Sequence, residues 1–272
     1  MRRFYIDPQS ISENMAILSP DESRHIAKVL RLQAGAKIEL FDGTGFIYQG
    51  VILSPSPEGI AVELLSRYQE HNAGERRLFL FQSILKGKKM DFLVQKATEL
   101  GVHSFRPVLS RYSDKHGSLP RQADRWQRIM LEACKQCKRA HPMIIEPTTP
   151  FSDVDVSAFA RPLVLWEKEK STSLDKTMFS HEGPMALFIG PEGGFHDDEI
   201  RALLAMNFEL VSLGARILRA ETAALSAIAI YATWLEPFRL TITHQQLVSP
   251  RWKAQRPLRL LHISDLHFEG PS

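Results

Sequence analysis

The segment from Leu78 to Leu85 constrains the fold most, because it is an almost unbroken apolar run of strand length. Such a run is typical of a strand that is buried on both faces of a sheet. Further strands are predicted at 105–109, 163–166 and 186–189. Helical patterns lie between them, one capped by Asp91 and stopped by Gly101, and another over 121–139. Strands that alternate with helices predict an α/β domain with a parallel sheet.

The first 70 residues have a different pattern. Short strands are predicted at 37–41, 46–53 and 59–65, and Asp42-Gly43-Thr44-Gly45 supplies the turn between the first two. A helix is predicted over 21–32, with Ile26, Val29 and Leu30 on one face. Several short strands at this spacing indicate a small barrel. We therefore expect a β-rich domain at 1–70, a polar linker near 71–75, an α/β domain at 71–236 and a tail at 237–272.

Composition excludes some classes of protein. The formal net charge of +3 permits a nucleic-acid partner without requiring one. No apolar run reaches the roughly 18–20 residues of a membrane helix, and the N-terminus lacks a signal sequence, so we expect a cytoplasmic protein with no membrane contact. Cys134 and Cys137 form a C-x-x-C pair, but it lies inside a helical pattern and has no second ligand pair. We expect the pair to be structural and expect no metal site.

The first motif that indicates chemistry is Gly190-Pro191-Glu192-Gly193-Gly194. It follows a buried strand that ends at Ile189 and precedes a helix with an acidic first turn. The carboxyl ends of strands are where open α/β sheets bind ligands. The pattern is neither a phosphate loop nor a dinucleotide fingerprint, and the acidic turn would repel a phosphate. A neutral or cationic ligand fits better, and an ordinary glycine-rich turn is the alternative.

The second motif runs from Leu213 to Ala223, where a strand leads through a loop into a helix over 220–234 that is rich in small residues. Arg216 and Arg219 lie in this loop and could hold a phosphate or the polar edge of a base. Alternatively, Arg219 only pairs with Glu221 or Glu192. The small residues indicate either a good helix former or a tightly packed element.

Three clusters of basic residues complete the pattern. Positive side chains occur in the first predicted helix, in the segment 86–89 and in the helix predicted over 121–139. A single cluster is usually a solvated face, but three in a chain of small net charge indicate a basic surface of the kind that nucleic-acid binders use.

Taken together, the motifs GPEGG and SLGARILRAETAAL resemble those of the RsmE-type small-subunit ribosomal RNA uridine methyltransferases, which belong to the SPOUT class. Three further stretches agree with that family: 90–102, 132–139 and 24–31. The resemblance covers about residues 1–236. It implies a knotted α/β methyltransferase domain behind a PUA-like RNA-binding barrel, a homodimer, and S-adenosylmethionine as the methyl donor. The implied reaction is methylation of a uridine N3 in 16S rRNA, either free or in the small ribosomal subunit.

The resemblance also assigns residues. The residues expected at the cofactor are Leu165, Ile189, Gly190, Pro191, Glu192, Gly193, Gly194, Leu213, Gly214, Ile217, Leu218 and Arg219. The loop Trp166-Glu167-Lys168 matches the family least. The residues expected at the RNA are Arg2, Arg3, Arg24, His25, Arg31, Lys86, Lys88, Lys89 and Arg139.

For the chemistry, an arginine is expected to stabilise the uracil anion, and the candidates are Arg139, Arg216 and Arg219. Either Glu192 or bulk water would accept the N3 proton. The rival reading is an RNA-binding protein that keeps the scaffold without the chemistry.

The tail lies outside this resemblance. Its stretch from Leu258 to Phe268 is similar to the first strand and D-x-H motif of metallophosphoesterases, in which Asp265 and His267 would be metal ligands. The chain supplies no later strands with the other ligands, so we expect the tail to be catalytically silent. A phosphoesterase that acts through the tail is a third, weaker hypothesis.

Overall fold

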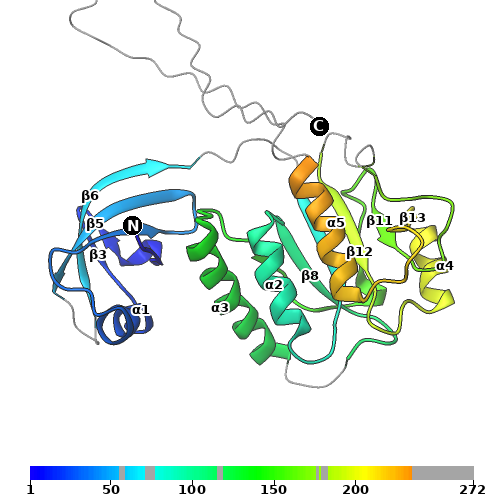
Figure 1. The fold of residues 1–272 in the computed structure, drawn as a ribbon, viewed down its shortest axis with the longest axis horizontal. Helices are drawn as coiled ribbons and strands as arrows, with labels where there is room; N and C mark the ends of the chain where they lie inside the picture. The colour runs from blue at the N-terminus through cyan, green and yellow to red at the C-terminus, as the bar shows by residue number, and fades with distance from the viewer. Residues whose placement is uncertain (55–58, 71–76, 115–118, 176–177, 179–182, 235–272) are drawn as a thin grey trace, which may run out of the picture. The chain divides into compact units, whose positions relative to one another are not determined.

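The computed structural model describes the chain except for residues 55–58, 71–76, 115–118, 176–177, 179–182 and 235–272 (Figure 1). The predicted linker at 71–75 and the tail with Asp265 and His267 therefore lie outside the described residues. So does most of the Ser54–Pro57 stretch, which follows the second predicted strand.

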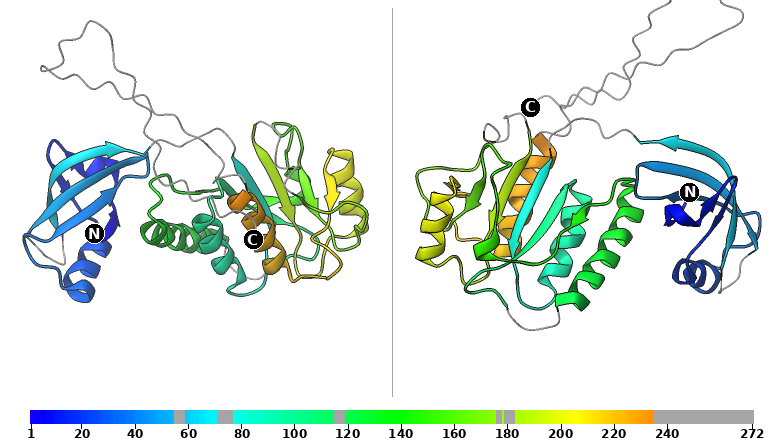
Figure 2. Two further views of the ribbon diagram at one scale, coloured as in Figure 1. Left: turned by 45° about the horizontal axis from the view of Figure 1, so that its top comes forward. Right: turned by 180° about the vertical axis from the view of Figure 1, so that it is seen from behind.

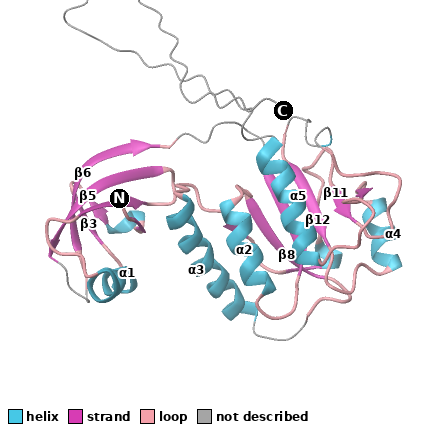
Figure 3. Cartoon of the chain, viewed as in Figure 1, coloured by secondary structure: helices cyan, strands magenta, loops and turns pink. Residues whose placement is uncertain are grey.

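A parallel sheet organises the larger part of the chain, as predicted (Figure 3). Its strands are β7 (Leu78–Ser83), β8 (Ser104–Leu109), β9 (Ile144–Ile145), β10 (Thr149–Pro150), β11 (Leu163–Leu165), β12 (Met185–Ile189) and β13 (Glu209–Val211). They run in the order β10-β8-β7-β12-β11-β13, with β9 pairing beside β8. The order is not the chain order, because β11 lies between β12 and β13. The loops that follow these three strands are consequently neighbours.

The apolar strands explain why this sheet is central. Side chains alternate between the two faces of a strand, so Leu187 and Ile189 of β12 pack into one core while Ala186 and Phe188 pack into another. The first core is covered by α2 (Lys89–Glu99), α3 (Leu119–Cys137) and α5 (Ala220–Trp234), and the second by α4 (Asp197–Ala205). Figure 2 shows α4 on the opposite side of the sheet from the other three helices. A strand without a polar face suits this double burial.

Helix α2 begins earlier than the sequence indicates. Asp91 is not its cap, because the helix starts at Lys89 without a side-chain cap. Asp91 lies in the first turn instead, and its carboxylate pairs with Arg125 at 2.6 Å. The predicted stop is confirmed: Gly101, with a φ of +82°, follows the last turn. Helix α5 has the predicted bounds, and its small residues Ala224 and Ala227 are buried on the side where it meets α2.

The helical pattern over 121–139 predicts a buried stripe formed by Trp126, Ile129, Met130, Ala133 and Cys137, and α3 departs from it at its end. Trp126, Met130 and Ala133 are buried as expected, but Cys137 is exposed and Cys134 is buried in its place. Cys137 is the last residue of α3. The C-x-x-C pair is thus split between core and solvent.

The N-terminal residues form a curled six-stranded sheet, in keeping with the predicted barrel. Its strands are β1 (Arg3–Tyr5), β2 (Ile11–Ser12), β3 (Met15–Ile17), β4 (Lys37–Phe41), β5 (Phe46–Ser54) and β6 (Ala61–Gln69), in the order β1-β4-β5-β6-β3-β2. The sequence indicated only the last three in chain order, since β1 to β3 are too short to show a period. The predicted turn is present, with Asp42 Oδ1 accepting hydrogen bonds from the amide and hydroxyl of Thr44, both at 2.8 Å.

The predicted helix over 21–32 is interrupted. It consists of α1 (Pro20–Arg24) and a π-helical segment, η2 (His25–Leu30). Ile26 is fully buried, but Val29, predicted on the same face, is 69% exposed. A π-helix closes its hydrogen bonds one residue later than an α-helix, so residues three apart no longer share a face.

We predict that the two cysteines differ in reactivity. Burial raises the pKa of the Cys134 thiol to about 12, so its reactive thiolate does not form at pH 8. A thiol reagent at pH 8 should therefore modify Cys137 in the native protein and both cysteines after denaturation. Mass spectrometry of the labelled peptides checks this, with Cys137→Ser as the control that should abolish native labelling. Equal native labelling of both thiols would contradict the described packing of α3.

Candidate active site

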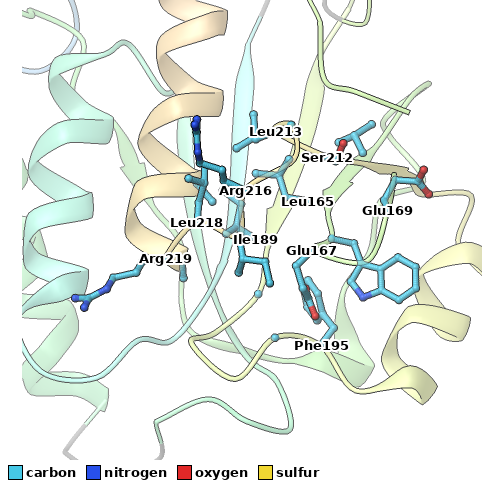
Figure 4. A pocket seen from close by; sticks show the side chains of 18 of the residues that line it. Leu165, Glu167, Glu169, Ile189, Phe195, Ser212, Leu213, Arg216, Leu218 and Arg219 are labelled. Carbon is cyan, nitrogen blue, oxygen red and sulfur yellow. The ribbon is translucent and has the colours of Figure 1, made fainter. Parts of the chain in front are cut away.

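A cavity of about 870 Å³ opens at the carboxyl ends of β11, β12 and β13 (Figure 4). Strand β11 pairs with both neighbours, and the register sets Leu165 opposite Ile189 on one side and Val211 on the other. The three strands therefore end at one level, and the loops after them line a single space. Its size falls within the roughly 300–1,000 Å³ of small-molecule sites, and its position is the usual one for ligands of open α/β sheets.

The structure places every residue that was predicted to contact a cofactor in the lining of this cavity. These residues are Leu165, Ile189, Gly190, Pro191, Glu192, Gly193, Gly194, Leu213, Gly214, Ile217, Leu218 and Arg219. The two glycine-bearing loops, far apart in sequence, thus face one pocket rather than packed side chains.

Apolar side chains form much of the wall. Figure 4 shows Leu165, Ile189, Leu213 and Leu218 gathered around the cavity. The first two are buried strand ends, and the other two are half-buried in the third loop. Ile217, in contrast, is 81% exposed although it also lines the cavity. The site therefore offers an apolar surface that suits a flat ring.

The glycines are required for two different reasons. Gly214 has a φ of +98° with nothing within 4 Å of where a Cβ would lie, so its constraint is the backbone conformation. Gly190 has no positive φ, but a Cβ there would lie 3.1 Å from the buried ring of Phe195. The second loop is therefore held close to its own aromatic anchor.

Glu192 is engaged within the protein. Its Oε1 accepts a hydrogen bond from the backbone amide of Lys86 at 3.0 Å and another from Lys89 Nζ at 3.1 Å. Partial burial alone would raise the pKa of Glu192, but these hydrogen bonds and the Lys89 charge outweigh it and lower the pKa. Glu192 is therefore ionised near neutral pH and is a poor proton acceptor.

Arg216 and Arg219 both lie in the lining of the cavity and are exposed. The alternative in which Arg219 only pairs with Glu192 or Glu221 is wrong, because both carboxylates face Lys89 instead. Across the described part of the chain, neither arginine forms an ion pair. In Figure 4 the guanidinium of Arg219 points away from Leu165 and Ile189. Both side chains are thus available to a ligand at the rim.

The third candidate, Arg139, does not lie in the lining of the cavity. Its guanidinium donates to the backbone carbonyls of His141 at 2.5 Å and Thr98 at 3.1 Å. Arg139 follows the end of α3, and its side chain turns back toward the end of α2. Two of its N–H groups are therefore already used by backbone carbonyls. Its charge within one chain serves to hold these two segments together.

Several residues of the site were missed by the sequence analysis. Glu167 and Glu169 line the cavity beside Trp166, which the resemblance placed in the first of the cofactor loops without assigning it a role. The sequence feature that could have identified them is their position shortly after the strand that ends at Leu165. Gln82 is fully buried on β7 and donates to the carbonyls of Ser83 at 2.9 Å and Gly190 at 3.3 Å, which supports the second loop from beneath. Nothing in the sequence pattern singled it out.

The residues predicted to contact RNA divide by exposure. Arg2, Arg24, Arg31, Lys86 and Lys88 are exposed, whereas His25, Lys89 and Arg139 are half-buried. Arg3 is the exception that the structure corrects: it is 9% exposed and its Nε lies 2.6 Å from Glu39 Oε1. Phe4 faces the core of the N-terminal sheet, so alternation along β1 puts Arg3 on the opposite face, where its guanidinium donates to the backbone carbonyl of Lys138 just after α3.

The described residues contain no group of three or more His, Cys, Asp or Glu side chains placed to hold a metal ion. No described helix is long and apolar enough to cross a membrane.

Comparison with known families identifies both parts of the chain. Residues 72–232 match the model of an RNA methyltransferase domain, and residues 18–65 match that of an RNA methyltransferase PUA domain. The first match alone covers more than half of the chain.

Individual relatives agree along most of their length. A ribosomal RNA small subunit methyltransferase E from Buchnera aphidicola is 29% identical over 242 residues, covering 87% of this chain and 95% of the relative. One from Synechocystis is 32% identical, covering 86% of this chain and 78% of the relative. A crystal structure of a ribosomal RNA small subunit methyltransferase E from Neisseria gonorrhoeae, bound to S-adenosyl methionine, superposes with a TM-score of 0.76. Its identity is 30%, over 86% of this chain and 98% of that one.

We predict that Gly190→Ala lowers the free energy of unfolding by about 1–3 kcal/mol, because the added methyl group displaces the Phe195 ring from a packed core. Gly59→Ala is the matched control, since its Cβ would meet only Ile17 at 3.8 Å. Urea denaturation measures both. Equal stability of the two variants would show that Phe195 does not hold this loop.

Proposed function

The chain belongs to the RNA methyltransferase family of ribosomal RNA small subunit methyltransferases E, and from this premise we propose that it methylates N3 of a uridine in 16S rRNA. It is an S-adenosylmethionine-dependent ribosomal RNA methyltransferase. The uridine N3 is the finer proposal, and it carries over from the family resemblance. The observation that carries the catalytic site is the common level at which β11, β12 and β13 end.

The cavity fits the methyl donor in size and chemistry. Its volume of about 870 Å³ is ample for a nucleoside with an amino-acid arm. The leucine and isoleucine walls suit the adenine ring, and the carboxylates of Glu167 and Glu169 in the lining suit hydroxyl donors and a positive sulfonium. The residues proposed to hold the donor are the predicted set, together with Trp166, Glu167, Glu169 and Phe195.

When bound, S-adenosylmethionine supplies an electrophilic methyl group on a sulfonium. The chain must bring uridine N3 to within about 3–3.5 Å of that group. It must also stabilise the charge that spreads over O2 and O4 of the base as N3 loses its proton. Arg216 and Arg219 are proposed for this role, since both line the cavity and are free of ion pairs with described residues. Arg139 is not proposed to act at the base within the same chain.

The N3 proton is proposed to leave to solvent. Of the two acceptors considered from sequence, Glu192 is ionised but tied to Lys86 and Lys89, and its lowered pKa makes it a weak base. The products balance: the N–CH3 bond forms, the S–CH3 bond breaks with its electron pair remaining on neutral sulfur, and one proton is released.

The exposed cations are proposed to bind the RNA backbone. Arg2, Arg24 and Arg31 come from the N-terminal sheet and its helix, and Lys86 and Lys88 precede α2. Phosphate contacts position an RNA without reading its sequence, and the target base must be unpaired or flipped out to reach the cavity. The cytoplasm is the proposed location, and the predicted homodimer stays a prediction.

The decisive experiment uses ribosomes from cells that lack this protein. Mass spectrometry of nuclease-digested 16S rRNA should lack one N3-methyluridine, and the full chain with S-adenosylmethionine should restore it in vitro. Calorimetry should show that the chain binds the cofactor. Cofactor binding without methylation of any rRNA would favour the RNA-binding protein without catalysis, and methylation at another atom would refute the N3 assignment alone.

We predict that Arg219→Ala lowers kcat by about 10²–10³-fold, because removal of a donor that stabilises developing charge costs about that much in rate. Quantification of methyluridine over time measures the rate. Arg201→Ala is the control, since Arg201 is an exposed arginine on α4 that pairs with Asp198, and it should leave the rate unchanged. A variant at Arg219 with wild-type kcat would remove this residue from the proposed mechanism.

A further inference from the structure

We propose that Lys89 is a positioning residue that ties the second and third cofactor loops together, and that it does not bind RNA as the sequence pattern predicted. The inference rests on the proposed function, since it concerns how the same pocket is held. The ammonium group lies in the first turn of α2, in the lining of the cavity. It faces one carboxylate in the loop after β12 and one in the first turn of α5, directly after the loop that follows β13.

The geometry of the tie is specific. Lys89 Nζ is 3.1 Å from Glu192 Oε1 in the loop after β12, and 3.5 Å from Glu221 Oε2 in the first turn of α5. The three side chains are 33%, 25% and 17% exposed, so water screens them only in part. Glu192 Oε1 also accepts from the Lys86 amide, which fixes the loop to the start of α2. One cation thus connects the start of α2 to the loop after β12 and to the first turn of α5.

Glu221 depends on this cation. Its Oε2 is buried and has no hydrogen-bond partner among the described residues, which leaves the Lys89 charge to compensate it. A buried carboxylate without a counter-charge is costly. Without Lys89, two carboxylates would face each other across the pocket, and their repulsion would separate the loops after β12 and β13.

The same contacts argue against a role in RNA binding. A phosphate approaching Lys89 would meet Glu192 and Glu221, whereas Lys86 and Lys88 are exposed. The hydrogen bond to Glu192 is the largest of the effects that raise the pKa of Lys89, so the cation stays charged. Its charge is therefore used inside the site, where it prepares the two loops for the cofactor. A site that is held in its bound shape loses less entropy on binding.

The test compares four full-length chains: wild type, Lys89→Met, Lys89→Arg and Lys96→Met. Lys96 is the matched control because it lies on the same helix, is also 33% exposed and pairs with Glu99, away from the cavity. Calorimetry with S-adenosylmethionine measures the Kd. Filter binding of small ribosomal subunits from cells lacking the protein measures RNA affinity.

We expect Lys89→Met to raise the Kd for S-adenosylmethionine about tenfold and Lys89→Arg to restore it to within about threefold of wild type. KM for the cofactor should rise with Kd while kcat changes less, a split that a general loss of folding would not produce. Lys96→Met should leave the Kd unchanged, and all four chains should bind subunits equally.

Unchanged cofactor affinity with weaker subunit binding in Lys89→Met would overturn the proposal and return Lys89 to the RNA surface. Failure of Lys89→Arg to restore affinity would also refute a tie made by charge. Should Lys89→Met not fold, Glu221→Gln is tested in its place. An unchanged Kd of that variant for S-adenosylmethionine would also refute the proposal. If the wild type itself does not bind S-adenosylmethionine, the proposed function fails instead.

Discussion

The pairing of β11 with β12 on one side and β13 on the other is the interaction on which the site depends. Backbone hydrogen bonds fix Leu165 opposite Ile189 and Val211, so three strands that are distant in sequence end at one level. A shift of one residue in any of them would turn its side chains to the other face. It would also move its loop out of the cavity. The doubly buried apolar strands resist such a shift, because each face is packed into its own core.

The cations in the cavity and beyond it differ in whether they bind groups of the protein or are exposed. Lys89 and Arg139 are half-buried and bind groups of the protein itself. Lys89 pairs with two carboxylates, and Arg139 donates to two backbone carbonyls. Arg216 and Arg219 are exposed at the cavity and face no described carboxylate closely enough to pair. A catalytic cation must be held near its target yet not neutralised by the protein. The arginines of the loop after β13 are not neutralised by the neighbouring Glu221, because Glu221 faces Lys89.

Particular elements show where sequence reasoning succeeded. The sequence located β7, β12 and α5 well, because the residue pattern within each of these elements reflects which of its side chains are buried. The predictions were wrong where the exposure of a residue depends on the helix type or on its place in the helix. Val29 is exposed because a π-helical segment changes the period, and Cys137 is exposed at the last residue of α3. Strands β1 to β3 are two or three residues long, and a period cannot be read from so few positions.

The sequence by itself determined the α/β class and the two glycine-bearing loops, because these follow from the apolar period and from backbone freedom at glycine. The motifs also predicted residues that the structure places around one cavity. Only the tertiary structure decided what each charged residue does. Arg3 and Lys89 look like other surface cations in the sequence, yet one pairs with Glu39 and the other with Glu192 and Glu221. The physical reason is that the partner of a charge is set by distance in space. Residue type reveals only that a partner is needed.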